Sequence, residues 1–143
     1  RAGRSGRPDR AASSGSSMTA LVDARAHLAK AREFLDAARS NLDLDLFNAA
    51  TSDAVISGIN SKDAICLRLT GTTRKADGHH EAVAELKASG PAGAAVAPTL
   101  SRLLKLKTKS QYQSVSVAAA DATKAVEWAT RLLEGAEGVV SSR

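Results

Sequence analysis

The sequence predicts an all-α protein, and three observations indicate this class. Apolar residues make up 43% of the 143-residue chain, but aromatic residues only 3%, and alanine dominates the apolar set. Alanine is the best helix former, and its small side chain lets helices approach closely. Apolar residues recur every three or four positions in long segments, whereas strand-like alternation never extends beyond a few residues. We expect one domain, a five-helix up-and-down bundle with two long antiparallel helices and short third and fourth helices.

The limits of this domain follow from composition. Residues 1–17 (RAGRSGRPDRAASSGSS) are low-complexity and show no periodicity, so we expect a disordered leader. Met18 resembles a natural start, which would make the leader an upstream extension or an expression remnant; a basic arm that binds nucleic acid is the alternative. The helical domain should cover 18–137, and residues 138–143 should form a frayed tail.

Charge and cysteine content narrow the function classes. The formal charge is +5, but residues outside the leader carry only 16 basic against 14 acidic side chains. The isoelectric point near 9.7 therefore does not by itself indicate a nucleic-acid-binding domain. Cys66 is the single cysteine, so no internal disulfide is possible and we expect the reducing cytoplasm. No apolar run reaches the 18 residues typical of a membrane span.

The first helix is expected from about Thr19 to Leu42, because apolar residues recur there in alternating steps of three and four. This seam consists of Leu21, Ala24, Leu28, Ala31, Leu35, Ala38 and Leu42. Such spacing suits a long helical neighbour. The segment Asn41–Asp45 is too short for anything but a tight link, so the second helix should return antiparallel.

The second helix should run from about Asp45 to Thr70, end at Gly71, and form the centre of the bundle. Its apolar arc is wide, which indicates neighbours on more than one side. Gly58 in its middle costs about 1 kcal/mol relative to alanine, so we expect another backbone to cross closely there. These two features predict a homodimer through this helix and its flanks. A polar stripe along it is either an internal hydrogen-bond seam or one wall of a groove. The stripe consists of Asp53, Ser57, Asn60 and Ser61.

Three further helices complete the prediction. A short helix is expected over about His79–Ala88, followed by a flexible bridge, AGAAVAP, over 92–98. The fourth helix should begin near Pro98, since proline is favourable in a first turn. The fifth should run from about Val117 to Ala136, with an alanine-rich seam like that of the first helix. The first and fifth helices should both pack beside the second.

The loop after the second helix carries the best catalytic candidates: Arg74, His79 and His80, with Lys75 beside them. A guanidinium can hold a phosphate bidentately, and a histidine that titrates near neutral pH can move a proton. Cleavage of RNA without a metal needs little more, because the substrate supplies the 2′-hydroxyl. The alternative interpretation is an ordinary turn and helix start with exposed side chains.

A second candidate lies in the fourth helix, where Lys105, Lys107 and Lys109 precede Tyr112. Lysines beside an aromatic ring can form a phosphate-binding patch with a platform on which a base stacks. The alternative is a solvated surface. With one cysteine and three histidines, the supply of metal ligands is poor, so we expect neither a metal nor another cofactor. P-loop, dinucleotide and nucleophile-elbow motifs are absent.

Four segments of the chain carry a resemblance to a known family: SDAVISGINSKDAICLRLTG, ADGHHEAVAELK, LSRLLKLKTKSQYQS and VAAADATKAVEWATRLLE. Their pattern and order resemble the HEPN superfamily, small helical bundles of prokaryotic toxin–antitoxin and RNA-processing systems, and are most similar to its stand-alone actinobacterial members. The resemblance implies a dimer with a cleft between protomers. It also implies, for active members, an arginine followed after four to six residues by a histidine at the start of a late helix, and metal-free RNA cleavage.

This chain departs from that motif. Its late-helix segment has Lys107 and Tyr112 where active members have arginine and histidine, whereas Arg74 and His79 have the right spacing one helix earlier. Lys107 and Tyr112 are therefore the alternative catalytic pair. The expected RNA contacts are Asn60, Lys75, Lys105, Lys107, Lys109 and Tyr112.

The sequence thus predicts an RNA-associated protein, in its sharpest form a metal-independent ribonuclease of a toxin–antitoxin or RNA-processing system. The alternative is a non-catalytic dimeric bundle that binds a protein partner, such as a nucleotidyltransferase or an antitoxin. A cleft that carries Arg74, Asn60 and one of the two histidines would favour the first function. The same residues scattered over open surface would favour the second.

Overall fold

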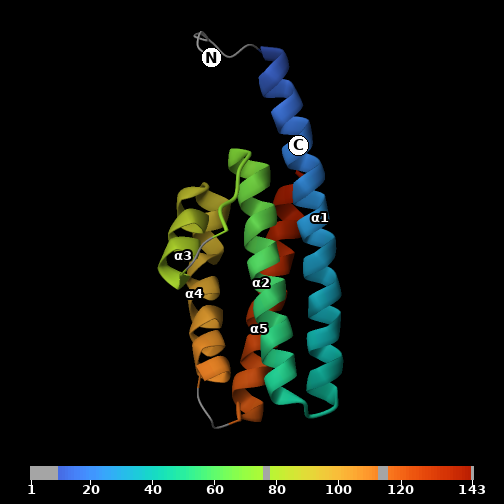
Figure 1. Ribbon diagram of the computed structural model, residues 1–143, viewed down its shortest axis with the longest axis vertical. Coiled ribbons are helices and arrows are strands. Elements are labelled where there is room, and N and C mark those ends of the chain that lie inside the picture. Colours follow the sequence, from blue (N-terminus) through green and yellow to red (C-terminus); the bar gives the residue numbers. More distant parts are fainter. Residues whose placement is uncertain (1–9, 76–77, 113–115, 143) are drawn as a thin grey trace.

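The computed structural model describes residues 10–75, 78–112 and 116–142, with side chains over 17–75, 78–107 and 116–142. Within these ranges the chain forms five helices and no strand (Figure 1). The helices are α1 (Arg10–Asp43), α2 (Phe47–Thr70), α3 (His79–Ala88), α4 (Pro91–Tyr112) and α5 (Ala119–Ser141). The predicted all-α bundle is therefore confirmed.

Helix α2 is the centre of the bundle, because it contacts each of the other four helices. The predicted seam of α1 is buried from Ala24 to Ala38, and the alanine seam of α5 is buried from Ala122 to Ala136. Both helices pack against α2, as the sequence predicts. Figure 1 shows α3 and α4 side by side on the other flank of α2.

The link between α1 and α2 makes the tight antiparallel return that the sequence predicts. The amide of Asp45 donates to the carbonyl of Leu42 at 3.0 Å, and Asp45 adopts a left-handed conformation with φ 60°. Helix α2 ends as expected at Gly71, whose φ of 84° allows its amide to donate to the carbonyl of Leu67. A side chain at such a φ would be strained, which explains glycine there.

Gly58 marks a close approach, but of side chains and not of a backbone. A methyl group at this position would lie 2.5 Å from Leu103 Cδ2 of α4 and 3.2 Å from Leu132 Cδ1 of α5. Most of the wide apolar arc of α2 is likewise buried against helices of the same chain, whereas Leu69 near its end is exposed. Neither feature requires a second copy of the protein at α2.

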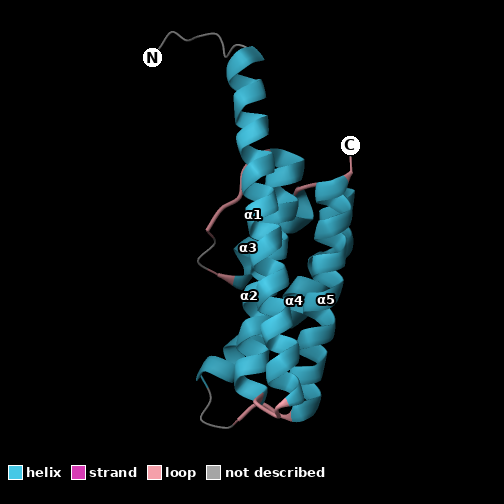
Figure 2. Cartoon of the chain, turned by 90° about the vertical axis from the view of Figure 1, so that its right-hand side faces the viewer, coloured by secondary structure: helices cyan, strands magenta, loops and turns pink. Residues whose placement is uncertain are grey.

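Helix α1 begins at Arg10 and not at Thr19, so residues 10–17 of the expected disordered leader are helical. Once a helix is formed, adding a residue costs far less than starting a new helix, so α1 can extend toward the N-terminus. At 34 residues against 24, α1 is ten residues longer than α2, or about 15 Å. Figures 1 and 2 show this end projecting beyond the bundle. Residues 1–9 lie outside the described ranges.

Helix α4 is not short, and the expected flexible bridge over 92–98 is part of it. The helix begins at Pro91, spans 22 residues and contains Pro98 in its interior. Proline removes one backbone hydrogen bond there, but Ala97 and Leu100 around it are buried in the core. Packing therefore outweighs the unfavourable propensity. Helix α3 contacts α4 and spans His79–Ala88, as predicted.

Helix α5 continues past the predicted end at Ala136 to Ser141. Val139 and Val140 are buried, and Arg68 donates a hydrogen bond to the carbonyl of Ser142 at 2.7 Å. Apolar burial thus orders residues 138–142 of the tail that we expected to fray, and residue 143 lies outside the described ranges.

Candidate functional site

A cleft of about 420 Å³ opens between α1, α2, the loop after α2, the start of α3, and α4. We call it the basic cleft. Its lining residues are His27, Lys30, Ile59, Asn60, Lys62, Asp63, Arg74, Lys75, Gly78, His79, Ala82, Leu104 and Lys107.

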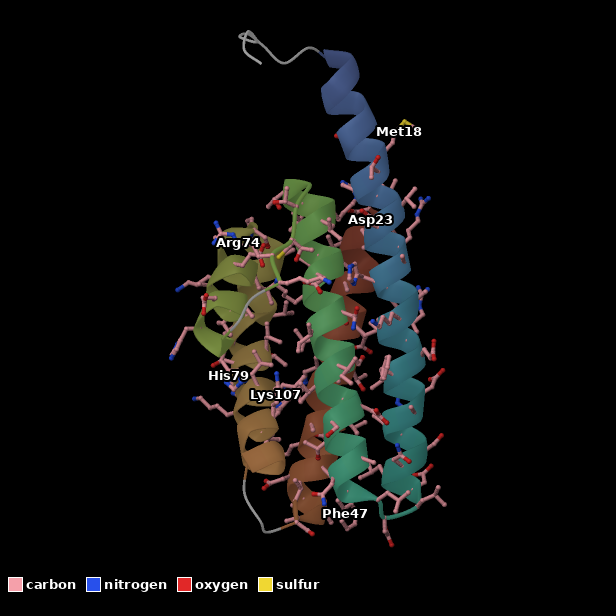
Figure 3. All side chains as sticks on the ribbon, viewed as in Figure 1. Met18, Asp23, Phe47, Arg74, His79 and Lys107 are labelled. Atoms are coloured by element: carbon pink, nitrogen blue, oxygen red, sulfur yellow. The ribbon has the colours of Figure 1, made fainter. Side chains whose placement is uncertain are left out.

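Five of the residues that the sequence singled out line this cleft together. Asn60 comes from α2, Arg74 and Lys75 from the loop, His79 from the start of α3, and Lys107 from α4. Figure 3 shows Arg74, His79 and Lys107 on these three separate segments, on the same flank of the bundle. The loop and the late-helix segment were separate candidates in the sequence, and the fold brings them to one place.

Four other candidate residues are not among the lining residues, and for two of these the side chain lies outside the described ranges. His80 and Lys105 are exposed and are not among the lining residues. Lys105 lies two residues before Lys107, and side chains two positions apart on an α-helix are rotated by roughly 200° about its axis. Lys105 therefore points away from the cleft. The side chains of Lys109 and Tyr112 lie outside the described ranges.

His79 is suited to accept a proton. Burial, the positive charge of Lys107 and the electrostatic effect of the adjacent His80 lower its pKa below the usual value. The imidazole is therefore more fully neutral at pH 7 than a solvated histidine would be, and only the neutral ring can act as a base.

His27 is a cleft residue that the sequence reasoning missed. Its Nδ1 lies 2.8 Å from Asn60 Oδ1 and 3.9 Å from Asp63 Oδ2, and its side chain is 32% exposed. His27 directly precedes Leu28 of the α1 seam, so it sits at the edge of the interface with α2. That position was the available signal. The partner Asn60 lies 33 residues away, and only the fold reveals it.

Lys62 is the second residue that the sequence reasoning missed. Its side chain is only 2% exposed, and its Nζ pairs with Glu85 Oε1 and with Asp63 Oδ1 at 3.1 Å. Burial alone would lower its pKa, but the hydrogen bonds and charges of Glu85 and Asp63 outweigh burial and raise it. Lys62 is thus a buried, fully charged ammonium group.

This ammonium group holds the loop that lines the cleft. Lys62 Nζ donates to the carbonyl of Arg74 and to Thr73 Oγ1, each at 3.1 Å. The amide of Arg74 donates to Glu85 Oε2 at 2.9 Å. The backbone of Arg74 is therefore held on both sides, which limits the region that its guanidinium group can reach.

The cleft has a positive balance of charge. Among its described lining residues, Asp63 is the one carboxylate, and it faces Lys62. The remaining cations are Lys30, Arg74, Lys75 and Lys107. A concave surface lined by one sign of charge focuses the field and favours ligands of opposite sign. Phosphate groups fit this description.

Two features are absent from the described part of the chain. No group of three or more His, Cys, Asp or Glu side chains there could hold a metal ion. In the same ranges, no helix is both long and apolar enough to cross a membrane.

Comparison with known proteins agrees with the fold. No curated protein matches the chain. The sequence model of the HEPN domain matches residues 24–139, from the seam of α1 almost to the end of α5. This match covers most of the chain and all the lining residues of the basic cleft. The chain therefore belongs to the HEPN-domain family.

Proposed function

We propose that the basic cleft binds the phosphate backbone of RNA and that His79, with Arg74, cleaves it without a metal ion. The observation that carries this proposal is that Arg74, His79 and Asn60 line one cleft together with Lys75 and Lys107. Membership of the HEPN-domain family agrees with an RNA-associated role.

The chemistry follows from the groups present. The cations Arg74, Lys75 and Lys107 neutralise a phosphate, and His79 accepts the proton of the neighbouring 2′-hydroxyl. The 2′-oxygen then forms a bond to phosphorus, the bond from phosphorus to the 5′-oxygen breaks, and the 5′-oxygen leaves as a hydroxyl after gaining a proton. A general base of this kind contributes roughly 10²–10⁴-fold in rate.

The size of the cleft indicates the form of RNA. A volume of about 420 Å³ falls in the range of sites for small ligands. We therefore expect one unstacked nucleotide of a single strand to enter the cleft, and not a duplex. DNA lacks the nucleophilic 2′-hydroxyl, so it should bind without being cleaved.

The test is cleavage of a mixed-sequence RNA in EDTA. We expect His79→Ala to reduce the rate at least about 100-fold. His80→Ala is the matched control, because His80 adjoins His79 in sequence but lies outside the lining. It should change the rate less than about threefold, because substitutions at exposed positions have small effects.

Two outcomes would contradict this assignment. Equal rates in all variants would indicate a contaminating nuclease. Loss only in Tyr112→Phe would move the chemistry to the alternative pair in the late helix, Lys107 and Tyr112.

A second candidate function, contact with another protein, is favoured by a different surface. Met18, Leu21 and Leu69 line a groove beside the projecting end of α1, where Met18 is 71% and Leu69 41% exposed. Clustered exposed apolar side chains often mark a protein contact. We propose that a second copy of the chain covers this groove and forms the homodimer.

Light scattering tests this homodimer. We expect twice the chain mass for the unmodified protein and a smaller mass for the Met18→Ser, Leu69→Ser variant. A strict monomer would contradict the homodimer and leave a nucleotidyltransferase or antitoxin as the occupant to test.

A further inference from the structure

We propose that His27 is the general acid of the basic cleft and protonates the leaving 5′-oxygen from its Nε2 atom. This inference rests on the proposed cleavage of RNA. It adds His27 to that reaction, a residue that is not among the catalytic candidates chosen from the sequence. Its basis is a second histidine in the same cleft as His79, held in a defined orientation by groups on α2.

The hydrogen bonds define which nitrogen of His27 is available. Asn60 Nδ2 donates to the carbonyl of Ile56 at 2.9 Å, so the amide presents its Oδ1 to His27. An amide oxygen only accepts hydrogen bonds, so His27 Nδ1 must be the donor across the 2.8 Å contact. The proton that can be transferred is therefore on Nε2, which has no hydrogen-bond partner among the described residues.

The two histidines of the cleft lie beside groups of opposite charge. Asp63 Oδ2 lies 3.9 Å from Nδ1, so the protonated ring has an opposite charge beside it. The other charged or titratable groups of the cleft come from every neighbouring element. They are Lys30 on α1, Lys62 on α2, Arg74 and Lys75 in the loop, His79 on α3 and Lys107 on α4. His79 faces the positive charge of Lys107, whose effect, with burial, lowers its pKa. One histidine thus adjoins a carboxylate and the other an ammonium group.

The step balances with these two groups alone. His79 takes the proton from the 2′-hydroxyl, and the 2′-oxygen forms a bond to phosphorus. The bond from phosphorus to the 5′-oxygen breaks, and His27 gives its Nε2 proton to that oxygen. The products are a 2′,3′-cyclic phosphate and a 5′-hydroxyl, and the two histidines exchange their protons with solvent to reset the cleft.

The experiment compares two substrates, only one of which has a leaving group that must be protonated by a general acid. In uridylyl-3′,5′-adenosine the leaving group is the 5′-oxygen of adenosine, an alkoxide that must be protonated. In uridine 3′-(4-nitrophenyl phosphate) the leaving group is 4-nitrophenolate, which is stable without a proton. We expect His27→Gln to slow cleavage of the dinucleotide at least about 100-fold. It should slow cleavage of the nitrophenyl ester less than about threefold, since the phenolate leaves without a proton. His79→Ala should slow both. Arg25→Ala, an exposed change on α1, should slow neither.

A measurement on the unmodified protein keeps the inference testable if His27→Gln folds poorly, which circular dichroism would reveal. The pH profile of kcat/KM should be bell-shaped with the dinucleotide and should lack the alkaline limb with the nitrophenyl ester. A bell with both substrates would overturn the role of His27, as would equal losses on both substrates in His27→Gln. Failure of the unmodified protein to cleave either substrate would instead overturn the proposed function.

Discussion

The Nζ atom of Lys62 lies 3.1 Å from the carbonyl oxygen of Arg74, which links a buried cation of α2 to the loop that lines the basic cleft. The same ammonium group pairs with Asp63 and Glu85. One buried charge therefore contributes both to the stability of the bundle and to the position of a candidate phosphate ligand. The two contributions can be measured separately.

Replacing Lys62 with methionine should destabilise the fold strongly. The change would leave Asp63 and Glu85, which are 15% and 18% exposed, without their shared partner. Breaking a buried ion pair on one side costs about 3–5 kcal/mol. Urea unfolding should show this loss, whereas Lys87→Met at an exposed position of α3 should stay within about 0.5 kcal/mol. Equal losses in the two variants would contradict the network.

The ammonium group of Lys62 should also make the free energy of unfolding depend on pH in the alkaline range. The pKa of Lys62 is raised above its ordinary value of 10.5, so the folded state binds this proton more tightly than the unfolded state. The stabilisation is complete below 10.5 and is lost as the pH rises through the higher pKa of the folded state. Urea unfolding from about pH 9 to about pH 11.5 should show a decline that Lys62→Met lacks. Parallel curves would show that Lys62 carries no such linkage.

Gly58 on α2 and Gly138 on α5 form a matched pair, because only Gly58 is packed against other side chains. In Gly58→Ala, the new methyl would meet the buried Leu103 and Leu132, whereas in Gly138→Ala nothing lies within 4 Å. Alanine gains up to about 1 kcal/mol in helix propensity, but overpacking costs about 1–3 kcal/mol. We expect Gly58→Ala to lower the free energy of unfolding and Gly138→Ala to raise it by a few tenths to about 1 kcal/mol. A gain in both variants would mean that the core at Gly58 has spare room.

The thiol of Cys66 should be unreactive in the folded protein. The side chain is fully buried, and burial raises its pKa to about 11 from 9.0. Two pKa units reduce the thiolate fraction about 100-fold at pH 8, and the thiolate is the reactive form. Labelling with a disulfide reagent should be at least about 100-fold slower in buffer than in urea. Rapid labelling in buffer would show that α2 opens readily around Cys66.

Much of the fold was predictable because the seams of α1 and α5 are local and periodic. Gly71 also marks the end of α2, and α3 has the predicted bounds. The errors came where packing outweighs local preference. Pro98 looks like a helix start in sequence, but burial of its neighbours keeps α4 continuous through it. Gly58 indicates a close approach, yet a sequence cannot say that leucine side chains of the same chain make it.

The site was predictable in part. Arg74 and His79 stand out as polar groups in a loop, and Asn60 as a polar group on an apolar helix. His27 and Lys62 gave no comparable signal, because their partners lie far along the chain: Asn60 is 33 residues from His27, and Glu85 is 23 residues from Lys62. Only the packing of α1 and of the loop against α2 brings these groups together.

The binding of RNA by the basic cleft is tested most directly by two charge reversals on α4. Lys107→Glu and Lys105→Glu change the net charge equally and lie two residues apart, but only Lys107 lines the cleft. Fluorescence anisotropy with a labelled single-stranded RNA at several salt concentrations is the measurement. We predict that Lys107→Glu raises Kd at least about tenfold and reduces the salt slope by about one, whereas Lys105→Glu changes Kd less than about twofold, because an exposed charge away from the contact acts weakly. Equal weakening by the two reversals, or no binding by the unmodified protein, would contradict the assignment of this cleft to RNA.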